Sequence, residues 1–291
     1  MFNIETYLDS LPEDTEEINV YNKNIQNLDV TRFKNLKKLN CVNNKLTSLH
    51  LNENLQLLYC PNNHLTSLHL NENLKELYCF HNQLTSLRLN AKLEKLFCNN
   101  NQLTSLHLNE TLNFLDCSDN QLTSLYLNTN LQNLYCFHNQ LTSLHLNETL
   151  QILYCANNHL TSLHLNETLN FLDCHDNQLT SLRLNTNLQN LYCFRNQLTS
   201  LHLNEQLEGI TYDNNPIYEI INSHEIDIIK QKFEILNNFR YSYYCLKFKK
   251  RFRDLLWVKI REPKIRERYS HDYLVKHLHE HTDLDELLEN W

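Results

Sequence analysis

The sequence predicts a mostly β solenoid of parallel strands, followed by an α-helical region at its C-terminal end. The first observation is the string Leu-Thr-Ser-Leu, which recurs nine times at one constant spacing, first at Leu46, next at Leu65 and last at Leu198. The second is that this pattern degrades near residue 220, after which apolar residues follow helical spacing. A segment this short cannot bury its own apolar side, so each copy must stack on its neighbours.

Each unit places apolar residues at fixed positions around an asparagine. In one unit these are Leu55, Leu58, Cys60, Asn63, Leu65, Leu68 and Leu70. Leu58 and Cys60 lie two apart and share one side of an extended strand, whereas Tyr59 faces the other side. Strands of successive units lie about 4.8 Å apart and are expected to pair in parallel. The spacing of Leu68 and Leu70 predicts a second short extended segment on the opposite wall.

This L-x-x-L-x-C-x-x-N-x-L pattern resembles that of the leucine-rich repeat family, over roughly residues 15 to 220. The resemblance implies a horseshoe or arc with its strands on the concave face. Because the units are short, we expect little helix on the convex face. We predict an N-terminal cap at 1–17, about eleven solenoid units at 18–220 and an α-helical region at 221–291.

The repeated asparagine and cysteine are predicted to serve the core. An unpartnered buried amide costs about 1–3 kcal/mol, so Asn63 and its equivalents should bond backbone groups of their own and neighbouring turns. The chain has one glycine, Gly209, so asparagine is expected to supply the left-handed turn residues. Nine cysteines, from Cys41 to Cys193, occupy one position in consecutive units. We interpret them as small buried apolar residues, because parallel side chains suit neither a disulfide nor a zinc site.

The ends of the solenoid are expected to be covered. Residues 3–10 are predicted to form a short capping helix, followed by a longer, degenerate first unit that holds Ile18, Val20, Ile25, Leu28 and Val30. At the other end the unit positions are filled by Ile210, Tyr212, Asn215, Ile217 and Ile220. Asn222 with Glu225 resembles a capping box. Helices are predicted at 223–236, 240–261, 270–280 and 282–290, with breaks near Asn237-Asn238 and Pro263.

Composition and the N-terminal sequence point to an intracellular protein. The net charge is −8 and 41% of residues are apolar, which is typical of a water-soluble fold. No stretch approaches the roughly 18–20 apolar residues of a membrane span, and residues 1–17 do not resemble a secretory signal. The free thiols indicate a reducing compartment. Asn109, Asn147 and Asn166 begin glycosylation sequons, which matter only in a secreted chain.

The C-terminal segment carries a second resemblance. The runs 257–265, 269–274 and 284–291 are similar to the tails of uncharacterised proteins from giant viruses of the mimivirus group. This resemblance implies a viral origin and a location in the host cytoplasm, and it leaves association with the virion open.

The best candidate site is the outward face of the strands. The residues there are Tyr59, Tyr78, Phe97, Asp116, Tyr135, Tyr154, Asp173 and Tyr192, flanked by Phe80, Phe137, Phe194, Phe114 and Phe171. Aromatic side chains anchor interfaces because they offer a large area at low entropic cost. They also stabilise neighbouring strands, and residues 112–148 and 169–205 are nearly identical, so duplication alone can produce such a stripe.

A second row stands between the last two leucines of each unit, on the predicted convex wall. It consists of His50, His69, Arg88, His107, Tyr126, His145, His164, Arg183 and His202. Imidazoles can bind metal or sense pH, but arginines interrupt the row and no carboxylate occupies it. We interpret the row as a solvated surface and predict neither a metal nor a cofactor.

The basic stretch 247–253 has two interpretations. It can contact nucleic acid or an anionic membrane. Phe248 and Phe252, four apart, share a helix face that we expect to point inward, which favours a capping helix. Cys245 invites comparison with bacterial leucine-rich repeat effectors that carry a ubiquitin-ligase domain. The segment 221–291 is too short for that domain, so we predict a structural cysteine.

These observations favour a non-enzymatic function. A phosphate-binding glycine loop needs more than one glycine, and neither a nucleophile elbow nor a zinc-binding HExxH helix is present. We predict an interaction scaffold whose concave face binds a protein partner, viral or host. The alternatives are a structural or assembly protein of a giant virus and an adaptor that acts through the C-terminal helices. We expect no small-molecule substrate and no membrane partner, do not favour nucleic acid, and leave the oligomeric state open.

Overall fold

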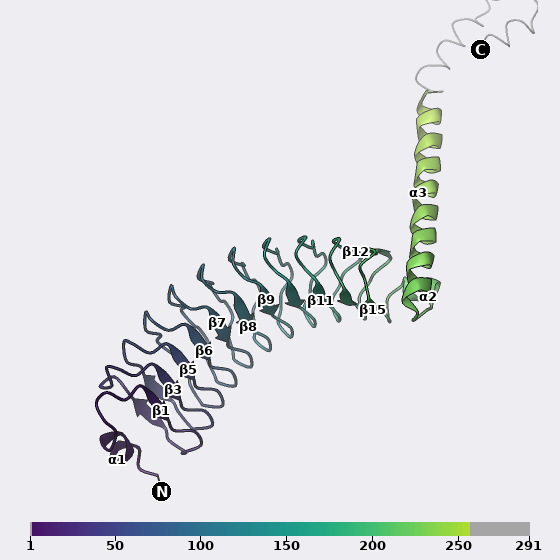
Figure 1. The fold of residues 1–291 in the computed structure, drawn as a ribbon. Helices are drawn as coiled ribbons and strands as arrows, with labels where there is room; N and C mark the ends of the chain where they lie inside the picture. The colour runs from purple at the N-terminus through teal and green to yellow at the C-terminus, as the bar shows by residue number, and fades with distance from the viewer. Residues whose placement is uncertain (1, 257–291) are drawn as a thin grey trace, which may run out of the picture. The chain divides into compact units, whose positions relative to one another are not determined.

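The computed structural model describes residues 2–256 (Figure 1). The chain divides into two compact units, residues 1–233 and a second unit that begins at Glu234, so the boundary lies inside helix α3. The first unit holds the solenoid, whose successive turns follow a curved path (Figure 1).

One sheet of eleven parallel strands runs through the solenoid, with one strand in each turn. Its strands are β1 (Glu17–Asn19), β3 (Lys38–Asn40), β5 (Leu57–Tyr59), β6 (Glu76–Tyr78), β7 (Lys95–Phe97), β8 (Phe114–Asp116), β9 (Asn133–Tyr135), β10 (Ile152–Tyr154), β11 (Phe171–Asp173), β13 (Asn190–Tyr192) and β15 (Gly209–Thr211). Leu58 pairs with Leu77, its equivalent in the next unit, and the other steps keep this offset except the first. There Glu17 pairs with Lys38, which confirms the longer first unit. The predicted parallel β solenoid is confirmed.

The second extended segment forms on the opposite wall, which we call the back wall. Two pairs of strands are regular there: β2 (Asn27–Asp29) with β4 (Ser48–His50), and β12 (Ser181–Arg183) with β14 (Ser200–His202). Between them, isolated parallel bridges join Arg88 to His107 and His107 to Tyr126. The back wall is therefore extended, as predicted, but it pairs less regularly than the main sheet.

The core between the two walls consists of leucine columns and the cysteine column. All nine cysteines from Cys41 to Cys193 are buried as free thiols. Burial raises the pKa of each of these thiols well above its usual range, because the thiolate is poorly solvated there. This agrees with the interpretation of the cysteines as core residues.

The repeated asparagine joins each turn to the next. The Nδ2 of Asn139 donates to the backbone oxygens of Cys117 at 3.0 Å and Cys136 at 3.2 Å, and its Oδ1 accepts from the Leu122 amide at 2.9 Å. The same pattern recurs along what we call the asparagine ladder: Asn44, Asn63, Asn82, Asn101, Asn120, Asn139, Asn158, Asn177, Asn196 and Asn215. The predicted role of this asparagine is confirmed.

The left-handed turn residue is the one before the ladder asparagine, and its type varies. Asparagine holds it in five units, at Asn43, Asn62, Asn100, Asn157 and Asn214, whereas Asp119, Asp176, His81, His138 and Arg195 hold it in the others, all at φ between 50° and 56°. The prediction that asparagine supplies these turns is therefore wrong for five of the ten units that carry a ladder asparagine, and holds in the first turn at Asn22 and Asn24. The reason is the backbone: the amide of Arg195 donates to Asp213 O at 2.9 Å in the next turn. Such bonds offset the roughly 1–2 kcal/mol that the conformation costs.

A second row of asparagines supports the opposite end of each turn and was not foreseen. The Nδ2 of Asn128 donates to the backbone oxygens of Asn109 at 2.6 Å and Leu112 at 2.8 Å. The row comprises Asn52, Asn71, Asn90, Asn109, Asn128, Asn147, Asn166, Asn185 and Asn204. The three sequon asparagines belong to it; Asn166 donates to Leu150 O at 2.9 Å and Thr168 Oγ1 at 2.6 Å.

The N-terminal end is covered by helix α1 (Ile4–Asp9), as predicted. The side chain of Asn3 caps this helix by accepting from the Thr6 amide at 3.2 Å. Leu8 of the helix and Phe33 of the first turn are both buried. The apolar first turn is thereby shielded from solvent.

The C-terminal end differs from the prediction in two details. Helix α2 (Tyr218–Ile221) starts before the last expected position, so Ile221 is buried and Ile220 is exposed. Asn222 is the left-handed C-cap of α2, so its assignment to a capping box is wrong. The ring of Tyr212 lies 5.3 Å from that of Tyr218 and 5.8 Å from that of Phe233, which closes this end.

Helix α3 (Ile226–Leu256) runs without interruption through Asn237 and Asn238, so the predicted break there is wrong. Asparagine lowers helix propensity by only a few tenths of a kcal/mol, so Asn237 and Asn238 do not end a helix this long. Phe248 of the same helix is exposed, which contradicts its predicted inward position. The predicted helices at 270–280 and 282–290, and the virus-like tail, lie outside the described residues.

We predict that Asn139→Ala lowers the free energy of unfolding by about 2–4 kcal/mol, because it leaves the Leu122 amide and two inward carbonyls without their partner. The neighbouring exposed Gln140 provides the control, and Gln140→Ala should change stability by less than about 0.5 kcal/mol. Urea unfolding measures both. Equal effects of the two substitutions would contradict this role of the ladder.

We predict that one of the ten cysteines reacts with a thiol reagent in the folded protein and that all ten react in denaturant. Cys245 is exposed, whereas the nine others are buried and have raised pKa values. Cys245→Ser should therefore abolish the native reaction. Rapid modification of a second thiol in the folded Cys245→Ser variant would show that the cysteine column is accessible.

Candidate functional site: an aromatic column on the main sheet

Aromatic rings stack continuously along the outward face of the main sheet. Tyr78 lies 4.6 Å from Tyr59 and 4.5 Å from Phe97, measured between ring centroids. The eight rings of this aromatic column are Tyr59, Tyr78, Phe97, Phe114, Tyr135, Tyr154, Phe171 and Tyr192, with successive centroids 4.5–5.7 Å apart. Since the rings face one another, their rims and the tyrosine hydroxyls are what the column presents to solvent.

The column continues through the two units that carry aspartate. Asp116 and Asp173 replace the tyrosine there, but Phe114 and Phe171 stand two residues earlier on the same strand face. The ring of Phe114 lies 4.6 Å from Phe97 and 5.5 Å from Tyr135. The aspartates therefore interrupt the tyrosine row without interrupting the stack.

The column is half-buried along most of its length. Tyr192, near its C-terminal end, is the most open of its tyrosines at 39%. Burial, followed by the nearby Glu76 carboxylate, raises the pKa of Tyr78 to about 12. Its hydroxyl lies 3.3 Å from Glu76 Oε2. The phenol of Tyr78 is therefore a neutral hydrogen-bonding group around neutral pH.

Carboxylates flank the column in two clusters. In the first, Asp116 accepts from the Ser118 hydroxyl at 2.6 Å, and His138 Nδ1 lies 3.2 Å from Asp119. Burial raises the pKa of Asp116, although the hydrogen bonds from Ser118 oppose this effect. The first cluster thus holds a partly desolvated carboxyl group beside the rings.

The second cluster has the same carboxylates with more basic partners. The Nδ1 of His175 bonds Asp173, and its Nε2 lies 3.8 Å from Asp176, which Arg195 also approaches at 3.5 Å. The imidazole stacks on Phe194 with centroids 4.3 Å apart and planes at 11°. The second cluster therefore has an arginine, Arg195, where the first has His138 beside its carboxylates.

The two clusters belong to nearly identical blocks, residues 112–148 and 169–205. The blocks differ at three positions only, which are Ser118 against His175, Tyr126 against Arg183 and His138 against Arg195. In the second block His175 and Arg195 both approach Asp176, whereas Ser118 and His138 of the first block contact Asp116 and Asp119, so two of the differences alter the surroundings of these carboxylates. The third lies on the back wall.

The structure brings six of the eight proposed site residues into one column. The six aromatic residues join it, whereas Asp116 and Asp173 stand beside it. Phe114 and Phe171, predicted as flanking residues, are members of the column. The available signal was that each phenylalanine stands two positions before an aspartate, and residues two apart on a strand share a face.

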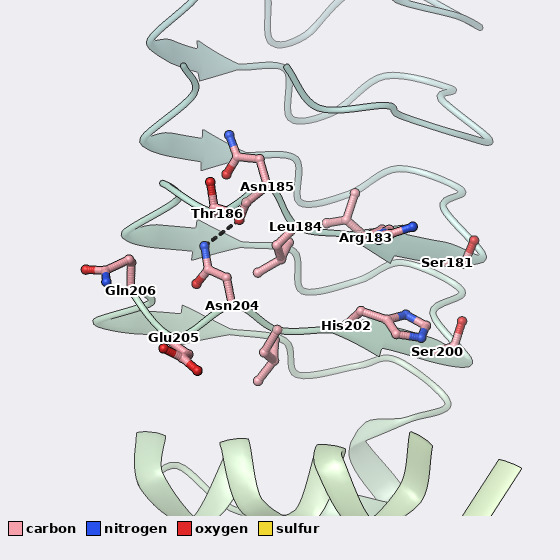
Figure 2. Close-up of a pocket in the computed structure, with 12 residues that line it drawn as sticks. Ser181, Arg183, Leu184, Asn185, Thr186, Ser200, His202, Asn204, Glu205 and Gln206 are labelled. Atoms are coloured by element: carbon pink, nitrogen blue, oxygen red, sulfur yellow. Dashed lines mark hydrogen bonds between the residues drawn. The ribbon is translucent and has the colours of Figure 1, made fainter. Parts of the chain in front are cut away.

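The histidine row lies exposed on the back wall, with shallow hollows between adjacent turns. In the hollow of Figure 2, of about 730 Å³, Arg183 and His202 extend from neighbouring strands, and Leu184 and Leu203 also line the hollow. Among residues 2–256, no three His, Cys, Asp or Glu side chains are grouped to hold a metal ion. Within the same residues, no helix is both long and apolar enough to cross a membrane.

Comparison with known proteins finds similarity at the level of solved structures. No protein-family model matches the chain, and no curated protein matches it. The functional domain of InlJ from Listeria monocytogenes, which includes a cysteine ladder, aligns at 33% identity over 68% of this chain and 48% of its own, with a TM-score of 0.64.

Two further structures share the fold at lower identity. The APL1 leucine-rich repeat domain aligns at 23% identity over 70% of this chain and 63% of its own, with a TM-score of 0.65. The LRIM1/APL1C complex aligns at 23% identity over 72% of this chain and 45% of its own, with a TM-score of 0.64. The chain thus spans about half to two thirds of the length of these structures. Because its stacked units repeat the leucine, cysteine and asparagine positions in parallel register, the chain has the fold of the leucine-rich repeat proteins.

Proposed function

We propose that the protein is a non-enzymatic scaffold that binds a protein partner along the aromatic column. The observation that carries this proposal is the continuity of the column, which keeps eight aromatic rings in one stack across eight consecutive strands. The compensation by Phe114 and Phe171 preserves that continuity where the tyrosine is lost.

A stacked column suits binding because its side chains are already ordered in the free protein. Each ring is held between its neighbours, so little side-chain entropy remains to be lost when a partner docks. The rims offer apolar area, and tyrosines such as Tyr135 and Tyr154 add hydroxyls that can donate and accept. Tyrosine is among the residues that contribute most to measured interfaces. One protein of similar fold was solved as the LRIM1/APL1C complex.

The adaptor alternative also has an observation in its favour. Within its described part, helix α3 exposes Phe239, Tyr241, Tyr243, Tyr244 and Phe248, together with Lys247, Lys249, Lys250 and Arg251. Exposed aromatic residues on a basic helix form a second surface that a partner can recognise.

We predict that replacing Tyr78, Tyr135 and Tyr154 together with alanine weakens partner binding by at least about tenfold, since hot-spot truncations cost about 2 kcal/mol or more. A partner captured by the wild-type chain is first purified. Its affinity for the wild type and the variant is then compared by calorimetry.

The matched control replaces Gln83, Gln140 and Gln178, which are exposed beside the asparagine ladder. This triple variant should bind as the wild type does. If the tyrosine variant is folded and binds with unchanged affinity, the column is not the partner site. Loss of binding on substitution of Phe239 and Phe248 would then assign the partner to α3.

A second prediction separates stacking from binding. Tyr135→Asp alone should destabilise the protein by about 1 kcal/mol or more, because it opens the stack between Phe114 and Tyr154. Adding Asn133→Phe recreates the Phe-Leu-Asp strand of residues 114–116 and should restore most of that loss. Thermal unfolding of both variants measures the effect. If Asn133→Phe restores no stability, the rings do not act as a continuous stack.

A further inference from the structure

Arg183 and His202 form a pair of basic side chains on the back wall. They stand directly opposite each other on the parallel strands β12 and β14, as Ser181 and Ser200 do one step earlier. Leu182 and Leu201 between them are buried, so the arginine, the imidazole and both serines face outward. Figure 2 shows Arg183 and His202 extending to the same side of the wall.

The guanidinium of this pair has no carboxylate partner among the described residues. Elsewhere in that part of the chain, Arg32 pairs with Asp9 at 2.8 Å and Arg195 approaches Asp176 at 3.5 Å. With residues 2–256, Arg183 and Arg88 form no such pair. A surface arginine beside another basic side chain has no local counter-charge, so an external anion can pair with it.

The same four residue types recur five turns earlier. A parallel backbone β-bridge joins Arg88 to His107. Ser86, Ser105 and these two residues line one hollow of about 510 Å³. The residues that line this hollow include no carboxylate. The chain therefore carries two copies of one Arg-His-Ser-Ser arrangement on the same wall.

The neighbouring sequence distinguishes the arginine turns from the histidine turns. Every histidine of the row is followed by glutamate three residues later, as in His107 and Glu110. Arg88 and Arg183 are followed instead by Ala91 and Thr186. Glu205 does line the hollow of Arg183 and His202. Its backbone oxygen accepts from Lys230 Nζ at 2.8 Å, so the lysine ammonium lies near this hollow as well.

We propose that each of these two hollows binds a tetrahedral oxyanion of the phosphate or sulfate type. The arginine supplies a fork of N–H donors, the two serines supply hydroxyls and the imidazole supplies an N–H. An oxyanion with three or four acceptor oxygens can use all of these donors, whereas a carboxylate has two oxygens. Half-buried Leu184 and Leu203 line the hollow of Arg183 and His202 and offer an apolar surface for the organic part of such a ligand.

The duplicated block contains a built-in control. At the position of Arg183 the first copy has Tyr126, which is exposed and bridges to His107, with His145 on its other side in the next turn. Its surroundings otherwise match, because Thr129 corresponds to Thr186 and Ser124 to Ser181. Tyr126→Arg should therefore create a third hollow of the same kind, beside His145.

The test is a titration of the full chain with inorganic phosphate, and separately with sulfate, followed by the NMR signals of the histidine rings. Both anions should shift His107 and His202 saturably while His50, which faces Asp29, stays unchanged. Acetate and chloride at equal ionic strength should have little effect. Arg183→Gln should weaken the His202 response by about tenfold and leave His107 unaffected, and Tyr126→Arg should make His145 respond.

Circular dichroism establishes that both surface variants keep the fold. Equal shifts with all four anions would reduce the effect to ionic screening and overturn the proposal. A His202 response that survives Arg183→Gln unchanged would overturn it as well.

Discussion

The inward asparagine of each unit is the interaction on which the rest of the solenoid depends. Each short turn must reverse direction twice inside a core that excludes water, and its backbone groups there need partners. The amide of Asn139 satisfies carbonyls in its own turn and the preceding one, and an N–H in that preceding turn, which no apolar residue of that size can do. Leucine and cysteine then fill the remaining volume.

This support frees the turn from its usual residue requirements. The left-handed position accepts His81, Asp176 and Arg195 because neighbouring backbone bonds hold it in place. Large and charged side chains can therefore stand at the edge of the main sheet, where glycine would otherwise be favoured. The carboxylate clusters beside the aromatic column depend on this tolerance, because their basic members His138 and Arg195 both occupy the left-handed position.

Periodicity predicted the parallel register, the asparagine ladder and the buried cysteines, because each follows from positions that repeat without variation. Prediction was weaker where neighbours in space decide. Phe114 and Phe171 enter the column only because the rings before and after them leave a stacking site, which depends on distances between strands. Helix α3 continues through Asn237 and Asn238 because two weak helix formers cannot outweigh the long segments on both sides. Ile221 rather than Ile220 is buried, because helix α2 begins at Tyr218 and replaces the extended segment that the repeat pattern predicts there.

The range of the hydrogen bonds has a consequence for the inheritance of this protein. The ladder bonds of Asn139 join it only to its own turn and the adjacent one, so no turn depends on a distant one. The copies at 112–148 and 169–205 are nearly interchangeable. Loss or gain of the three turns between equivalent points, by slippage during replication, would leave every remaining bond with an equivalent partner. The length of the solenoid can thus vary among descendants in whole steps, and each step would change the reach of its aromatic surface without disturbing its ends.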